Sequence, residues 1–323
     1  MPATAPLAGD VHVNVPLTNF AQRYLQAASN FVGLRAFPNL PVSKQSDLYF
    51  VFDKESFLTD DAEERADGTE SVGGSFGLSQ DPYYARVYAF HKKVTDRQRA
   101  NADSQIKLEQ SASNFVVQKM LIKRERVFVD KMFTAGVWNF HSVVNTDWSV
   151  ETASPIEEIR TQKREVQLAT GYRPNRMLIG RTGFDTLMDN DEILSRIIGG
   201  STTAMPAHVK KQHLTELLEL DEILVMDSVV STLNAAKTEN EHKFIGSDDA
   251  LLYYAPMTLD AEEPTAGIQF SWTGFMGATD NGMRIKKFRK ESVESDIVEA
   301  QMAFDYKRTS AELGVFFSSV SST

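Results

Sequence analysis

The sequence predicts an α+β fold organised around one long helix. Three observations support this prediction. Apolar residues return at helical spacing from about Asp96 to Gly136 with no intervening proline, helical and strand patterns alternate from about 150 to 260, and strand-like alternation dominates after 265. No internal repeat of roughly 20–50 residues appears, which excludes solenoids and propellers.

The composition is that of an ordinary globular protein. Hydrophobic residues make up 42% and charged residues 24% of the 323 residues, and no run approaches the roughly 18 apolar residues of a membrane span. The opening MPATAPLAGDVHV lacks the basic and apolar regions of a secretory signal. The absence of cysteine excludes disulfides and thiolate chemistry and fits a reducing cytoplasm. A net charge of −10 argues against nucleic-acid recognition by the whole chain, although a local basic face stays open.

An arm and an extended excursion are expected before the long helix. The arm, residues 1–40, holds a short amphipathic pattern and ends in a proline-punctuated segment. That pattern consists of Phe20, Tyr24, Ala28 and Phe31. Leu48–Asp53 and Arg86–Val94 have strand composition, and the 32 residues between them show no helical period. We expect a two-stranded excursion that, like the arm, gains buried area by lying across neighbouring subunits.

The long helix has a predicted apolar stripe. Residues at steps of seven share one side, and a second set runs beside them. These are Leu108, Phe115, Ile122 and Val129, with Val117, Leu121, Phe128 and Met132. We expect the helix to end near Gly136, to span roughly 50 Å, and to pack against the late strand that contains Met302 and Phe304.

The second half predicts shorter elements. A helix should begin at Ser154 with Pro155 in its first position, and another should cover Val209–Leu220. Short strands are expected at four places, followed by alternating strands after 265. The four places are Met177–Gly180, Ile223–Met226, Phe244–Ile245 and Leu251–Tyr254.

No catalytic, cofactor or metal site is expected. His208 and His213 lie five residues apart, which places them on different sides of a helix. The tract Gly73–Gly77 lacks the Lys-Ser/Thr that a phosphate-binding loop needs, and residues 53–70 lack the ligand order of a calcium-binding loop. We therefore expect a protein that is not an enzyme.

The order of elements resembles the major capsid proteins of tailed phages, which share the Johnson shell fold with encapsulins. The resemblance covers roughly residues 40–320. It is carried by NLPVSKQSDLYFVFDKESF, the long helix ending KRERVFVDKMFTAGVWN, SPIEEI, GYRPNRMLIG, LDEILVMDSV, SDDALLYYAP, AGIQFSWTG and the closing ESVESDIVEAQMAFDYKRTSAELGVFFSSV.

The resemblance implies a domain plan and a function. The plan has an N-terminal arm (1–40), an extended loop (41–95), a peripheral domain with the spine helix (96–149 and 263–312) and an axial domain (150–262 and 313–323). The implied function is self-assembly into hexamers and pentamers of an icosahedral head that encloses packaged DNA without sequence-specific binding. The implied setting is a virion assembled in the host cytoplasm, with no membrane contact.

Further partners follow from the same resemblance. No scaffolding segment precedes the arm, so a separate scaffolding protein is expected, or the chain is already matured. A portal and a decoration protein are further expected partners. Some members of the family join subunits through Lys–Asn bonds and most do not, so covalent cross-linking through Lys44 or Lys54 and Asn281 stays open.

Three alternative functions stay open. An encapsulin-like compartment would share the fold, an enzyme with an α/β body would require a catalytic set, and a tail-tube or decoration protein would lack the central helix.

Two charged segments are the candidate subunit interface. Residues 53–70 hold eight acidic and two basic residues, and 284–290 hold five basic residues and no acid. Two interpretations stay open: both segments are solvated faces that differ in sign, or the acidic segment of one subunit lies over the basic segment of its neighbour. The proposed contact residues are Asp60, Asp61, Glu63 and Glu64 on one side and Arg284, Lys286, Lys287, Arg289 and Lys290 on the other.

Overall fold

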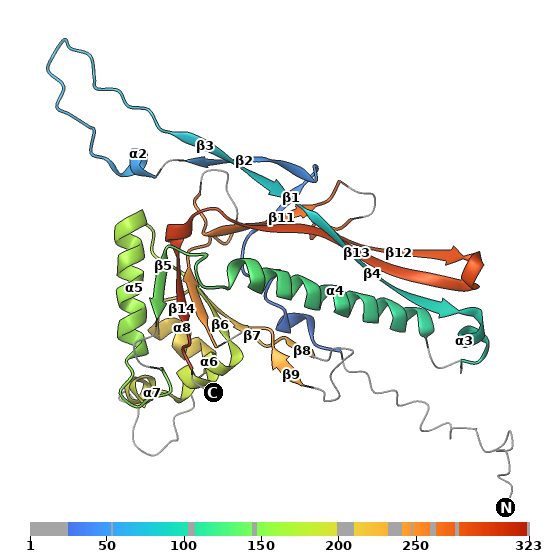
Figure 1. The fold of residues 1–323 in the computed structure, drawn as a ribbon. Helices are drawn as coiled ribbons and strands as arrows, with labels where there is room; N and C mark the ends of the chain where they lie inside the picture. Colours follow the sequence, from blue (N-terminus) through green and yellow to red (C-terminus); the bar gives the residue numbers. More distant parts are fainter. Residues whose placement is uncertain are drawn as a thin grey trace, which may run out of the picture.

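Two β-sheets, one on either side of a central helix, form the body of the protein in a computed structural model (Figure 1). The structure describes residues 25–52, 54–102, 107–143, 147–198, 210–231, 241–246, 248–258, 263–274 and 278–321. Most of the predicted arm, including Phe20 and Tyr24, lies outside the described residues, as do His208 and Asp53.

The first sheet is centred on β13 (Ser295–Arg308). Its early part pairs antiparallel with β12 (Met283–Lys290) and with β4 (Arg86–Thr95) on opposite edges. Its late part pairs with β11 (Gly267–Trp272), which pairs in parallel with β1 (Asn39–Val42). The predicted strands at Arg86–Val94 and after 265 are thus confirmed. Bulky β-branched and aromatic side chains explain why these segments are extended.

The second sheet has the order β5-β14-β10-β6-β7. Its strands are β5 (Phe140–Val143), β14 (Gly314–Ser318), β10 (Ala250–Tyr253), β6 (Arg176–Gly180) and β7 (Glu222–Met226). β6 is fully buried, as its continuous apolar run predicts. One apolar cluster joins this sheet to the central helix and a second joins it to the surrounding helices, so the sheet is covered on both faces.

Four helices surround the second sheet (Figure 1). They are α5 (Pro155–Thr170), α6 (Arg181–Asp189), α7 (Asp191–Ile198) and α8 (Lys211–Leu217). Pro155 occupies the first turn of α5, as expected, and Gly171 ends the helix with a φ of 78° that suits glycine. The smaller elements are η1 (Ala28–Asn30), α2 (Glu55–Leu58), β8 (Val229–Ser231), β9 (His242–Phe244), η2 (Glu291–Val293) and η3 (Ala311–Leu313).

The single long helix predicted for 96–136 is wrong, because the segment forms two helices. The first, α3 (Asp96–Ala100), begins with a capping box in which the Thr95 hydroxyl accepts from the backbone N–H of Gln98. The second, α4 (Leu108–Met132), has 25 residues and therefore spans roughly 37 Å. The capped start of α3 allows a separate short helix at the end of β4, so the spine is shorter than predicted.

The apolar stripe of α4 is also rotated from the predicted one. Phe128 and Met132 are buried as expected, but Phe115 is 38% exposed and Ile122 is only partly buried. The helix instead buries Ala112, Val116 and Met120 at steps of four, together with the side chains of Arg124 and Glu125. Two charged residues thus occupy positions on the buried side. Apolar periodicity alone cannot indicate such positions.

The described end of the arm lies in the core of its own subunit. Phe31, Val32, Ala36 and Phe37 are buried, and the Phe37 ring lies 4.9 Å from that of Tyr253. The expectation that the arm buries little within its own subunit is therefore wrong for 31–37.

Candidate subunit interfaces

The predicted two-stranded excursion is present. Strand β2 (Ser46–Phe52) pairs antiparallel with β3 (Leu78–Tyr84), and Figure 1 shows the hairpin and its long connection projecting away from the body. Two rings hold its base, because Tyr83 stacks on Phe270 at 4.4 Å and Tyr49 lies 5.3 Å from the same ring. Backbone hydrogen bonding between Ala85 and Gln45 closes the base (2.8 Å). The excursion is thus anchored at one end and unsupported at the other.

One face of the hairpin is apolar and open. Leu48, Phe50 and Leu78 are 55%, 60% and 52% exposed. Such a cluster on a projecting element indicates a surface that another chain covers. None of these three residues belongs to the interface predicted from the sequence. The signal was available, because LYFVFD carries apolar side chains on both faces of a strand, whereas a strand with one solvated face alternates.

The acidic candidate residues lie in the connection beyond this hairpin. Asp60, Asp61, Glu63 and Glu64 are all exposed. Lys54, at the start of the same connection, pairs with Glu312 of the body and with Glu55 at 3.3 Å. Within the described part of the chain, the acidic residues at 60–64 form no ion pair, and they remain available to a partner.

The basic candidate residues lie on β12, and most have partners within the subunit. Lys287 pairs with Glu109 at 2.6 Å, and Arg289 pairs with Asp96 at 2.7 Å. Lys286 lies 3.4 Å from Glu299. The hydrogen bond from Arg289 lowers the pKa of Asp96. Arg284 donates to the side chain of Gln301, and Lys290 is exposed. These pairs within the subunit neutralise much of the positive charge that the sequence of this segment carries.

The acidic and basic candidate residues do not meet within the described chain. Figure 1 places the acidic connection and the far end of β12 at opposite ends of the molecule. Their predicted contact is between subunits, and it stays a prediction.

A buried polar cluster fixes the chain segment 32–33 against α4. The Glu125 carboxylate accepts hydrogen bonds from the backbone N–H groups of Val32 (3.1 Å) and Gly33 (2.8 Å). Tyr306 accepts from Arg124 at 3.0 Å and donates to the Gly33 carbonyl at 2.8 Å. A Cβ at Gly33 would lie 2.9 Å from a Glu125 oxygen, so only glycine permits this approach.

The electrostatics of this cluster follow from burial. Burial raises the pKa of Glu125 to about 7, although the two backbone N–H groups and Arg124 favour its ionised form. The Ser228 hydroxyl, 3.5 Å from the carboxylate, links the cluster to the segment that follows β7. The arm, the spine and the second sheet therefore converge on one carboxyl group.

Among the described residues, no group of three or more metal-ligating side chains comes together. No helix among them is long and apolar enough to cross a membrane.

Comparisons with known proteins agree on one family. The model of the family described as phage major capsid protein E matches residues 129–261. A curated major capsid protein of Burkholderia phage BcepMu is 22% identical over 259 residues, which cover 78% of this chain and 80% of that protein.

Solved structures share the fold over nearly the whole chain. A phage-related protein from Bordetella bronchiseptica RB50 is 18% identical with a TM-score of 0.69, covering 92% of this chain and 94% of that one. The capsid of cyanophage P-SCSP1u is 11% identical with a TM-score of 0.58, covering 97% and 94%. The encapsulin of Synechococcus elongatus is 9% identical with a TM-score of 0.55, covering 96% and 97%. The chain is therefore similar in sequence to phage major capsid proteins, and it has the shell fold that phage capsids and encapsulins share.

Proposed function

We propose that the chain assembles into hexamers and pentamers that tile an icosahedral head around packaged DNA. The observation that carries this proposal is the open apolar face of Leu48, Phe50 and Leu78 on a hairpin that leaves the body. An isolated hairpin is marginally stable in water, so a neighbouring subunit that covers this face supplies the missing burial. Contacts of this head-to-tail kind close into rings.

The proposed domain division follows the two sheets. The peripheral domain contains α4 and the sheet around β13, and the axial domain contains the second sheet with α5–α8. Because β5 (Phe140–Val143) pairs with β14 in the second sheet, we place the first boundary near residue 139 instead of 149. The segment that returns to the axial domain begins at about 313, before β14.

The remaining assembly roles are proposals from the family. They are a separate scaffolding protein, a portal, a decoration protein and assembly in the host cytoplasm. The chain acts as a structural subunit without catalysis, and it encloses DNA without reading its sequence.

The charged segments are proposed to set register between subunits. Asp60, Asp61, Glu63 and Glu64 of one subunit would lie near the β12 cations of its neighbour. Those cations already form ion pairs with carboxylates of their own subunit. The acidic residues of the neighbour would therefore replace these carboxylates or share the cations with them, and each such exposed pair contributes ~0–1 kcal/mol. We expect the apolar hairpin face to contribute the area and the charges to select the partner surface.

Electron microscopy of the purified protein tests the assembly. Wild type should form closed shells or capsomer rings, and Phe50→Ser with Leu48→Ser should leave folded, unassembled subunits. Phe57→Ser, also on the excursion but outside the paired strands, is the matched control. Compact monomers under every assembly condition would contradict the proposal.

Charge reversal tests the register. Converting Lys286, Lys287 and Arg289 to Glu should block assembly, and adding reversal of the four acidic residues to Lys should restore it in part. Because this reversal also breaks pairs within the subunit, circular dichroism must first show that the variant is folded. Assembly equal to wild type would refute the contact.

An encapsulin-like compartment is the second candidate, favoured by the similarity to the Synechococcus encapsulin. Particles purified from the native source that contain protein cargo and no DNA would support it.

A further inference from the structure

A row of cations on the exposed side of α4 has no carboxylate partner among the described residues. Lys119, Lys123 and Arg126 are exposed and follow one another at steps of four and three, so they share one side of the helix. Lys92 on the neighbouring strand β4 is also exposed. Within the part of the chain that the structure describes, none of the four forms an ion pair.

The row is unlike the cations of β12. Lys286, Lys287 and Arg289 each lie within 4.0 Å of a carboxylate oxygen of their own subunit. Two acids lie near the row in the sequence. Glu125 is buried, and Asp130, one turn beyond Arg126, forms no ion pair with it. In a chain of net charge −10, the row is a local positive surface that no carboxylate among the described residues pairs with.

Aromatic rings hold the row in place. The Lys92 and Lys119 ammonium groups lie 5.0 and 5.6 Å from the centre of the Phe115 ring, and that of Lys123 lies 5.3 Å from the centre of the Tyr88 ring. These contacts fix the lysine side chains while leaving their charges open to solvent. They also explain why Phe115 stays 38% exposed instead of joining the core.

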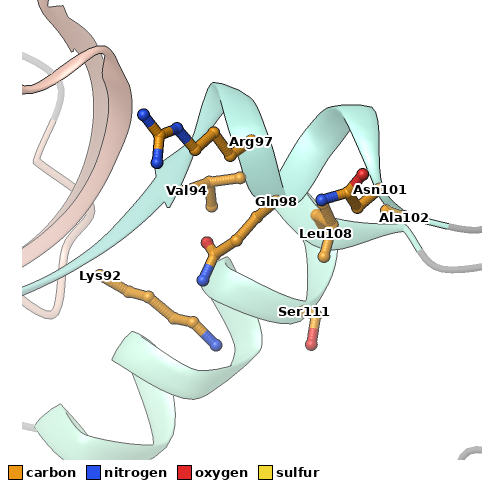
Figure 2. A pocket seen from close by; sticks show the side chains of 8 residues that line it. All are labelled: Lys92, Val94, Arg97, Gln98, Asn101, Ala102, Leu108 and Ser111. Carbon is orange, nitrogen blue, oxygen red and sulfur yellow. The ribbon is translucent and has the colours of Figure 1, made fainter. Parts of the chain in front are cut away.

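A hollow of about 460 Å³ continues the row between β4, α3 and the start of α4. Figure 2 shows Lys92 and Gln98 directed into the space above α4, with Asn101 and Ser111 at its far side. Arg97 also lines the hollow, and no carboxylate is among its described lining residues. The lining thus offers several hydrogen-bond donors and positive charge, which suits a phosphate group.

We propose that Lys92, Lys119, Lys123 and Arg126 bind the phosphate backbone of duplex DNA, with the hollow accepting a phosphate at the end of the row. The proposal rests on the proposed function, because packaged DNA is the polyanion that a head encloses. From Lys119 to Arg126 the row rises roughly 10 Å along the helix, and a duplex carries about one charge per 1.7 Å of axis. Several phosphates therefore face the row at once. The α4 side of the subunit is accordingly the side that faces the genome.

Fluorescence anisotropy of a short DNA duplex with unassembled wild-type subunit tests this proposal. Four phosphate contacts predict that affinity falls roughly 150-fold between about 50 and 200 mM salt. The variant with Lys92, Lys119, Lys123 and Arg126 changed to Gln should bind about 100-fold more weakly at the lower salt and lose the salt dependence. The DNA affinity of the double variant Lys119→Gln, Lys123→Gln should lie between that of wild type and that of the fourfold variant.

The matched control removes four exposed cations elsewhere. Changing Arg160, Arg164, Lys210 and Lys211 to Gln gives the same net charge as the row variant and should leave DNA binding unchanged. Equal losses in both variants, or no salt-dependent binding by wild type, would overturn the proposal. The proposal would also be overturned if wild-type subunit bound a synthetic peptide of residues 60–70 more tightly than the duplex. The row would then be a contact between subunits.

Electron microscopy of the row variant separates this proposal from the proposed function. Shells formed by a variant that has lost DNA binding support the row as a DNA contact and leave the assembly proposal intact. A wild type that binds DNA but never assembles contradicts the proposed function alone.

Discussion

The buried carboxyl group of Glu125 should make the stability of the subunit depend on pH. Replacing Glu125 by Gln removes the titrating group and keeps nearly the same volume. The amide can accept only one of the two N–H groups that Val32 and Gly33 direct at this position, and its own NH₂ opposes the other. The protonated carboxyl group of wild type has the same limit, so we expect the variant to match the stability of wild type at low pH and to differ from it only where Glu125 ionises.

The pH effect has a definite sign. Burial raises the pKa of Glu125 from its ordinary value of 4.5 to about 7. The folded protein therefore keeps a proton that the unfolded chain has already released, so the contribution of Glu125 to the free energy of unfolding is greatest below about pH 4.5 and is lost as pH rises to about 7. At about 1.4 kcal/mol per pKa unit, the loss is about 3 kcal/mol.

Urea denaturation of unassembled subunit between about pH 5 and pH 8 measures this effect. The free energy of unfolding of wild type minus that of Glu125→Gln should fall by about 3 kcal/mol across the range. Ser228→Ala, which removes a partner of the same carboxyl group but keeps the titration, should retain the wild-type pH dependence. A flat difference curve would show that hydrogen bonding keeps Glu125 ionised throughout and would refute the reasoning.

Three further predictions concern packing, a helix end and cations. Phe128→Ala should cost about 3–5 kcal/mol in urea denaturation, because the ring is buried against Phe37 and Tyr306, whereas Phe115→Ala should cost less than half as much; equal losses would mean that α4 is seated differently. Lys163→Met should cost about 1–3 kcal/mol, because the buried ammonium donates to two carbonyls beyond α8, at 2.8 Å each, and an unchanged urea midpoint would refute this role. Assembled particles should survive EDTA when examined by light scattering, whereas dissociation that calcium reverses would indicate a cation site in residues 60–70.

Local patterns in the sequence were enough to predict most of the elements. Alternation and β-branched composition predicted β4 and β13, and Pro155 predicted the start of α5, because these preferences act within a few residues. The excursion was predictable because a pattern was missing. Its 32 residues show no helical period, and such a segment has no apolar face to pack on the body of the protein. The order of these elements was sufficient to indicate the capsid fold.

Tertiary structure alone decided which charges are free. Lys287 meets Glu109 across 178 residues of sequence and Arg289 meets Asp96 across 193, because β12 and β4 pair with opposite edges of β13. Periodicity carries no information about such distant partners. For the same reason it could not indicate that Arg124 and Glu125 occupy the buried side of α4, where their partners come from the arm and from β13. Among the described residues, the cations of β12 are paired and those of the row on α4 are not, because strand pairing and helix packing bring carboxylates from distant segments to β12 only. No local segment of the sequence specifies these contacts.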